Sequence, residues 1–155
     1  TSFFYEGNDK GKNGCEFDGG CSSAITALGN PAIWWVAVVA VVLIAITWFK
    51  TRDRQAGLIL LGLGAGYLPW LIYLNRTTFQ FYSIVFLPWM LLALVMVLRA
   101  QVAGHSLEYQ PRSRSRTLTY LIGTFALSLF FLPIWIGTTI PYWFWLIHMW
   151  IPSWI

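Results

Sequence analysis

An uncharged apolar run from Ala32 to Phe49 constrains the fold of this chain more than any other feature. In a helix that rises about 1.5 Å per residue, the run reaches about 27 Å, which is enough to cross the hydrocarbon core of a bilayer. Further apolar runs follow at about 56–74, 79–98 and 118–140. We therefore predict an all-α membrane protein with four transmembrane helices.

The composition supports a location in a bilayer and argues against binding to nucleic acid. Of the 155 residues, 57% are hydrophobic and only 10% are charged, whereas a soluble domain carries charge on roughly a quarter of its residues. The formal charge of +4 is not gathered into the basic stripe or patch that nucleic-acid binding requires. The chain starts at Thr1 without a Met, a basic n-region or a cleavage site, so we expect no signal peptide and interpret it as a piece of a longer protein.

Residues 1–30 are expected to form a polar extracytoplasmic segment ahead of a membrane region at 31–155. They are rich in glycine and show neither a helical nor a strand period. Cys15 and Cys21 bracket a short flexible loop, and with no His or further Cys nearby they do not supply four zinc ligands. A disulfide in an oxidising compartment is the favoured interpretation, and two unpaired thiols are the alternative.

Basic residues cluster in two loops and so predict the orientation of the chain. One cluster lies at 50–54 and the other at 99–116. Because cytoplasmic loops carry an excess of Lys and Arg, the amino terminus, the turn at Arg76 and the carboxyl terminus are expected outside the plasma membrane. The run from Arg112 to Arg116 is favoured as a topology determinant, and binding of anionic lipid head groups is the alternative.

Arg76 is the only Lys or Arg between Arg54 and Arg99. Aromatic residues flank it on both sides, between two apolar runs. Such a cation is either an interfacial anchor, with a buried aliphatic stem and a hydrated charge, or a ligand for phosphate. The residues alone leave both interpretations open.

Proline and glycine mark special points in the predicted spans. Pro69, Pro88 and Pro133 each follow a leucine, and inside a helix each would free a carbonyl one turn earlier. Such breaks favour an outward-facing cavity, with ordinary helix bends as the alternative. Gly62 and Gly66 have the spacing that lets two helix backbones approach closely.

The stretch 141–155 is rich in tryptophan and predicts an aromatic segment along the outer interface of the membrane. His148 lies within it. A lone interfacial histidine is usually a hydrogen-bonding group without chemistry, and contact with a substrate is the alternative.

The sequence contains no recognisable catalytic constellation. Its carboxylates lie in the polar amino-terminal segment or in predicted cytoplasmic loops, at Glu6, Asp9, Glu16, Asp18, Asp53 and Glu108. There is no Ser-His-Asp spacing, no phosphate-binding glycine loop and no metal-ligand cluster. We expect no catalytic residue, metal site or cofactor in this stretch, and the metal dependence of a complete enzyme stays open.

Three runs of the chain resemble one known family: Cys21 to Trp35, Gly66 to Trp89 and Pro141 to Ile155. They are similar to the carboxyl-terminal four-helix region of actinobacterial-type protein O-mannosyltransferases, which resemble the multi-span lipid-dependent glycosyltransferases. The resemblance implies transfer of mannose from polyprenyl-phosphate-mannose to Ser or Thr of secreted proteins on the outer side of the membrane. The acidic Asp-Glu pair that the family carries near its amino terminus has no counterpart here.

The resemblance also implies the site residues. In the family, the arginine of the motif Asn-Arg-Thr-Thr-Phe-Gln-Phe-Tyr lies near the donor site, and here it is Arg76. A guanidinium binds two phosphate oxygens in a planar fork. Gln80 and Tyr82 follow on a helix expected to start near Phe79, and His148 completes the substrate-binding candidates. The implied partners are the lipid donor, membrane lipid, the amino-terminal remainder of the enzyme and secreted acceptor proteins.

Two other classes of function stay open. A non-catalytic packing or interaction module would explain the glycine-rich second span and the lack of carboxylates. A small transporter or channel subunit would need polar or ionisable residues facing inward at mid-membrane, and these spans offer almost none. Loss of transfer at an unchanged protein level would favour the enzyme, and loss of folded protein would favour the packing module.

Overall fold

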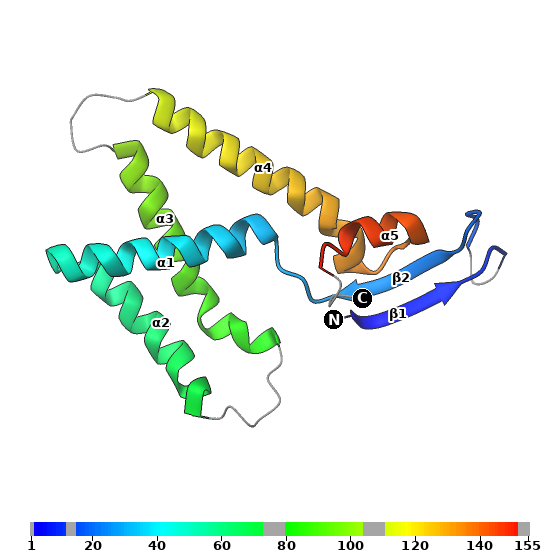
Figure 1. Ribbon diagram of the computed structural model, residues 1–155, viewed down its shortest axis with the longest axis horizontal. Coiled ribbons are helices and arrows are strands. Elements are labelled where there is room, and N and C mark those ends of the chain that lie inside the picture. Colours follow the sequence, from blue (N-terminus) through cyan, green and yellow to red (C-terminus); the bar gives the residue numbers. More distant parts are fainter. Residues whose placement is uncertain (1, 12–14, 73–79, 104–110, 152–155) are drawn as a thin grey trace. The chain divides into compact units, whose positions relative to one another are not determined.

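The computed structural model describes residues 2–11, 15–72, 80–103 and 111–151 of the chain. Most of these residues are helical (Figure 1). In chain order the elements are β1 (Ser2–Asn8), β2 (Cys21–Thr26), α1 (Pro31–Thr51), α2 (Arg54–Ile72), the 3-10 helix η1 (Gln80–Val85), α3 (Leu87–Ala103), α4 (Pro111–Ile136), β3 (Thr139–Pro141) and α5 (Tyr142–His148).

The chain divides into two compact units. One combines residues 1–31 with 123–155 and holds the strands and α5, and the other comprises residues 32–122 and holds α2, η1 and α3. The amino-terminal residues therefore share a unit with carboxyl-terminal ones, although the two segments are distant in sequence.

The first helix, α1, follows the uncharged run closely. Pro31 opens it, a favoured position because the ring presets φ and the missing N–H has no helical partner there. No charge interrupts it before Lys50 in the last turn, where a cation complements the exposed carbonyls. The helix predicted at 32–49 is confirmed, with one residue more at its start and two at its end.

A tight turn joins α1 to α2. Arg52 adopts a left-handed φ of 55°, and its guanidinium carbon lies 4.8 Å from the centroid of the Trp48 ring. Asp53 then caps α2, because its Oδ1 accepts a hydrogen bond of 2.8 Å from the backbone N–H of Ala56. The basic loop at 50–54 is thus a short, capped connection between two helices.

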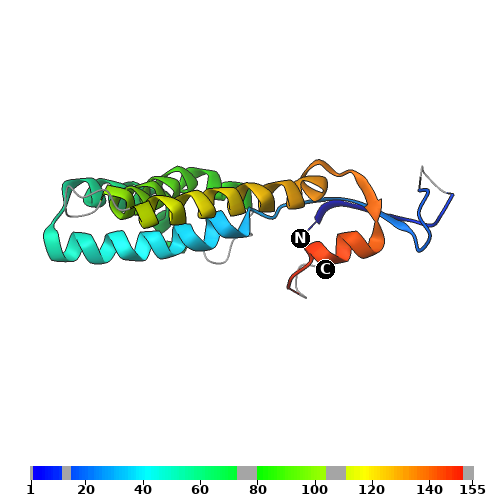
Figure 2. The same ribbon diagram turned by 90° about the horizontal axis from the view of Figure 1, so that it is seen from above.

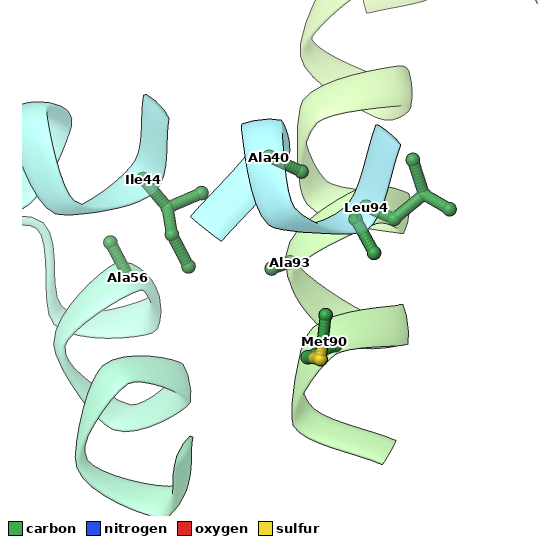
Figure 3. Close-up of a cluster of buried hydrophobic side chains, with 7 residues drawn as sticks. Ala40, Ile44, Ala56, Met90, Ala93 and Leu94 are labelled. Atoms are coloured by element: carbon green, nitrogen blue, oxygen red, sulfur yellow. The ribbon is translucent and has the colours of Figure 1, made fainter. Parts of the chain in front are cut away.

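Small and aliphatic side chains form the core of the helical unit. In Figures 1 and 2, α1 crosses α2 and α3 on one side. Alanines at the crossing let the helix backbones approach closely. The buried cluster, shown in close-up in Figure 3, contains Ala37, Ala40, Ile44, Ala56, Met90, Ala93 and Leu94.

Glycines on α2 make room for side chains from η1 and α3. A Cβ placed on Gly62 would lie 2.3 Å from Cε2 of the Trp89 indole, and one on Gly66 would lie 3.2 Å from Cγ1 of Val85. Only glycine at position 62 lets the indole lie flat against the helix. Close packing of these two glycines against a neighbour is confirmed, and at Gly62 that neighbour is a side chain, the Trp89 indole.

Three helices in the described part of the chain are long and apolar enough to cross a membrane: Pro31–Thr51, Arg54–Ile72 and the Arg114–Ile136 part of α4. The helix predicted at 79–98 is displaced, since Gln80–Val85 forms η1 and α3 begins only at Leu87. The apolar part of α3 is correspondingly shorter, at Leu87–Gln101. The fourth membrane crossing therefore stays a prediction.

The three prolines differ in their effects. Pro69 lies inside α2 and Pro133 inside α4, as predicted. Pro88 is instead the second residue of α3, where a backbone N–H has no intrahelical partner to lose. The predicted break of a span at Pro88 is wrong, because this proline helps to begin a helix.

The fourth predicted run, 118–140, also ends early. α4 stops at Ile136, and Gly137 follows with a φ of +69°, a conformation common directly after helices. The N–H and the hydroxyl of Thr138 both donate to the carbonyl of Pro133, at 3.1 and 3.0 Å. The chain then enters β3, so residues 139–140 are strand and not helix.

A three-stranded antiparallel sheet of order β1-β2-β3 lies in the unit that also holds α5 (Figure 1). Tyr5 of β1 pairs with Ala24 of β2, and Ser22 of β2 pairs with Ile140 of β3. The expectation that residues 1–30 lack strands is wrong, and the chain is mostly but not purely helical. The strand pattern escaped notice because the buried positions of β2 are small or hydroxylic, such as Ser22 and Thr26.

A second core joins this sheet to α4 and α5. It buries one residue each of β2 and β3 together with aromatic and aliphatic side chains of the carboxyl-terminal residues: Ala24, Phe131, Ile134, Ile140, Trp145 and Met149. The Asn30 amide adds a polar tie, donating to the Thr124 carbonyl at 2.9 Å and to Ser128 Oγ at 2.8 Å.

Candidate functional site

Two aromatic pairs lie where α2 ends and where η1 and α3 begin. The ring centroids of Trp70 and Tyr82 are 4.3 Å apart, and those of Tyr67 and Phe86 are 5.5 Å apart with the rings nearly perpendicular. Offset and edge-to-face contacts of this kind are favourable. These contacts join the end of α2 to η1 and the start of α3, on either side of residues 73–79.

Arg76 itself falls among residues that the structure leaves undescribed, so its predicted phosphate contact stays a prediction. Gln80 is the first residue of η1, and only its backbone is described. Tyr82 lies in the same 3-10 helix, half-buried against Trp70. The α-helical start near Phe79, on which the placement of Gln80 and Tyr82 rested, is wrong, because a 3-10 helix has a different residue spacing.

His148 is fully buried at the end of α5. Nδ1 lies 2.7 Å from the carbonyl oxygen of Phe144, and Nε2 lies 2.7 Å from the carbonyl oxygen of Phe130. The imidazole also stacks on the Phe130 ring at 4.1 Å. In this arrangement both ring nitrogens face the protein backbone, and a substrate contact through them stays an untested prediction.

Cys15 and Cys21 form a disulfide, with Cα atoms 5.8 Å apart and both residues buried. The loop around them is further ordered by a hydrogen bond of 2.8 Å from the Gly11 N–H to the Cys15 carbonyl and by an ion pair between Lys10 and Asp18. Both cysteine sulfurs are therefore taken up by the disulfide.

Within the described ranges, no group of three or more His, Cys, Asp or Glu side chains could hold a metal ion. Asp53 is occupied as a helix cap.

Two tertiary hydrogen-bonded contacts were not predicted from the sequence. The side-chain amide of Asn30, the residue before α1, binds α4. The Tyr120 hydroxyl donates to the Ala32 carbonyl at 3.2 Å. The first contact joins residues 94 positions apart in the sequence, and the second joins residues 88 positions apart. No local sequence pattern predicts pairs at such distances.

Apolar helices of membrane-spanning length define this chain as a helical membrane protein. It is similar over most of its length to actinobacterial protein mannosyltransferases. It is 29% identical over 145 residues to the polyprenol-phosphate-mannose–protein mannosyltransferase of Corynebacterium glutamicum. The identity to the proteins of the same name in Mycolicibacterium smegmatis and Mycobacterium tuberculosis is 30% and 28%, each over 142 residues.

These similarities cover 90% and 86% of this chain but only 27% and 26% of the relatives, so the chain spans about a quarter of their length. The resemblance to this family, expected from three sequence runs, is confirmed. No protein family model matches the chain. No solved structure matches it.

Proposed function

We propose that this chain is the carboxyl-terminal membrane part of a protein O-mannosyltransferase. The complete enzyme transfers mannose from polyprenyl-phosphate-mannose to Ser or Thr of secreted proteins. The observation that carries the proposal is the similarity, over most of the chain, to relatives whose name gives this donor and a protein acceptor. The catalytic carboxylates belong to the remainder of the enzyme, so the isolated chain is inactive.

Within this enzyme, the chain contributes to the lipid-donor site through Arg76. Its guanidinium binds the donor phosphate, and the apolar surfaces beside it accommodate the isoprenoid tail. Two observations support this placement: Arg76 is the only cation between Arg54 and Arg99, and aromatic pairs hold together the chain on both sides of it. Gln80 and Tyr82 supply further polar groups to the same site.

The membrane orientation follows from the basic loops. We assign four crossings of the plasma membrane, with residues 50–54 and 99–116 in the cytoplasm. The donor site and the acceptor proteins are then on the same, outer side. The tryptophan-rich segment 141–155 lies along the outer interface, which agrees with the exposure of Trp143 and Trp150.

Mannosyl transfer to a threonine-containing peptide, measured in membranes at matched protein level and varied lipid donor, tests the role of Arg76. A charge-assisted phosphate contact contributes roughly 1.5 to 3 kcal/mol, so Arg76→Ala should lower transfer efficiency about ten- to hundredfold. Arg76→Lys should recover only part of the loss, since an ammonium cannot reproduce the planar fork.

Arg116→Ala is the matched control, because Arg116 is an exposed arginine in the opposite, cytoplasmic set. It should leave transfer unchanged. If Arg76→Ala keeps the donor dependence of the wild-type enzyme, Arg76 is an interfacial anchor.

A packing module is the second candidate function, and the close fit of Trp89 over Gly62 favours it. In that case, substitutions at Arg76 would leave transfer per folded molecule unchanged. The amount of folded protein in the membrane would fall instead.

A further inference from the structure

The turn between α1 and α2 lies at the surface of the membrane that the two helices cross. Both helices have the length and the apolar composition for a crossing. Only Arg52 and Asp53 separate the last residue of α1, Thr51, from the first residue of α2, Arg54. Two extended residues reach no further than about 7 Å, so the turn stays close to both helix ends. Its side chains are therefore at the level of the lipid head groups.

This turn carries an excess of positive charge. Lys50, Arg52 and Arg54 are exposed, and Asp53 is the one acidic residue between them. Oδ1 of Asp53 accepts the hydrogen bond that caps α2. Within the described ranges, no ion pair joins any of the three cations to a carboxylate. The turn therefore keeps a net positive charge, which attracts anionic lipids at a membrane surface.

Trp48 holds the Arg52 guanidinium in place. The guanidinium carbon lies 4.8 Å from the centroid of the Trp48 ring, and the Arg52 backbone N–H donates to the Trp48 carbonyl at 2.9 Å. The indole is itself packed on α2, because a Cβ placed on Gly57 would lie 2.7 Å from its Nε1. A cation–π contact uses the face of the guanidinium, so the N–H donors in its plane stay available to an anion.

The surroundings of Arg52 favour a phospholipid over a soluble anion. A planar guanidinium binds two phosphate oxygens in a bidentate fork. Beside it, the Phe49 ring packs edge-on against Trp48 at a centroid distance of 4.9 Å and is 66% exposed. A soluble phosphate has no use for this apolar surface, whereas a phospholipid brings acyl chains that cover it.

We propose that the turn between α1 and α2 binds the head group of an anionic phospholipid. Arg52 binds the phosphate oxygens, and Lys50 and Arg54 add the charge that selects an anionic lipid over a zwitterionic one. The bound lipid fixes the turn at the membrane surface. This site is distinct from the donor site proposed at Arg76 and does not depend on mannosyl transfer.

Photo-crosslinking from the turn tests the site in the intact protein. A photoreactive amino acid replaces Gln55, an exposed residue in the first turn of α2. The protein is placed in nanodiscs of equal parts phosphatidylglycerol and phosphatidylcholine and illuminated, and mass spectrometry identifies the attached lipid. Phosphatidylglycerol should be attached about ten times as often as phosphatidylcholine, as expected for a charge-assisted contact. Equal attachment of the two lipids overturns the proposal.

Arg52→Gly removes the guanidinium without disturbing the backbone. Arg52 has a φ of 55°, in the left-handed region that glycine adopts at no steric cost. The thermal unfolding temperature of this variant should not fall, and its preference for phosphatidylglycerol should be largely lost. Arg52→Lys should keep part of the preference, because it retains the charge but not the planar fork. A preference that survives in Arg52→Gly contradicts the site.

Arg116→Ala is the matched control, because it removes one exposed arginine from the other basic cluster. It should keep the wild-type preference at position 55. An equal loss in this variant would show that the overall charge of the protein, and not the turn, attracts the lipid. Inorganic phosphate added at millimolar concentration should leave the attachment unchanged. Loss of the preference in its presence would show that the turn binds a soluble anion instead.

Discussion

The Cys15–Cys21 disulfide orders a loop with little core of its own, between β1 and β2. In a chain-entropy estimate, closing so short a loop stabilises the folded state by about 2 to 3 kcal/mol. We predict that Cys15→Ser lowers the free energy of unfolding of the hairpin by about this amount. The double variant Cys15→Ser/Cys21→Ser should behave like the single variant.

Mass spectrometry of the protein without reductant checks the pairing itself. It should find one peptide pair linked through Cys15 and Cys21. Two alkylated free thiols in the untreated protein would contradict the disulfide and remove one support for an extracytoplasmic amino terminus.

Individual site residues were only partly predictable from sequence. The disulfide follows from spacing and composition, since a short flexible loop brings two cysteines together. The surroundings of His148 do not, because Nε2 meets the backbone of Phe130, 18 residues away on another helix. Tertiary packing determines which atoms contact a histidine. The sequence alone therefore left both interpretations of His148 open, a hydrogen-bonding group or a substrate contact.

At the scale of elements, the contact of α2 with α3 depends on Gly62. A methyl group there would meet the Trp89 indole at 2.3 Å. Overpacking of this kind typically costs about 1 to 3 kcal/mol. Gly62→Ala should therefore lower the thermal unfolding temperature of the protein in detergent.

Gly64→Ala is the matched control on the same helix. Its added methyl group would meet only Leu68 Cδ1, at an ordinary 3.6 Å. Alanine also favours helix by up to about 1 kcal/mol over glycine, so this variant should be neutral or stabilising. Equal destabilisation by both alanines would show that the indole does not lie against Gly62.

Helix existence was predictable, and helix boundaries were predictable only where a local signal marks them. The end of α1 is marked by charge, and its start by Pro31. The apolar residues 79–86 were expected to form the start of the third helix, because hydrophobicity alone does not separate a 3-10 helix from an α-helix. The pairing of β2 with β3 could not be predicted, because it joins residues as distant as Ser22 and Ile140.

At the scale of the whole molecule, the orientation in the membrane is open to direct test. Single cysteines introduced next to Arg76 and Ser153 should react with a membrane-impermeant thiol reagent added to intact cells. A cysteine next to Arg114 should react only after the membrane is permeabilised, because the basic loops lie in the cytoplasm. Inverted labelling would place the proposed donor site on the wrong side of the membrane.

The central claim is that this chain forms part of a lipid-donor site, and photo-crosslinking tests it most directly. A photoreactive amino acid replaces Tyr82 in the intact enzyme, which is then illuminated with radiolabelled polyprenyl-phosphate-mannose. A second protein carries the same group at Leu118 of α4, an exposed position in an apolar run. The account predicts labelling at position 82 well above that at 118, and its loss with excess unlabelled donor or with Arg76→Ala. Equal labelling at both positions, unaffected by competitor, would contradict it.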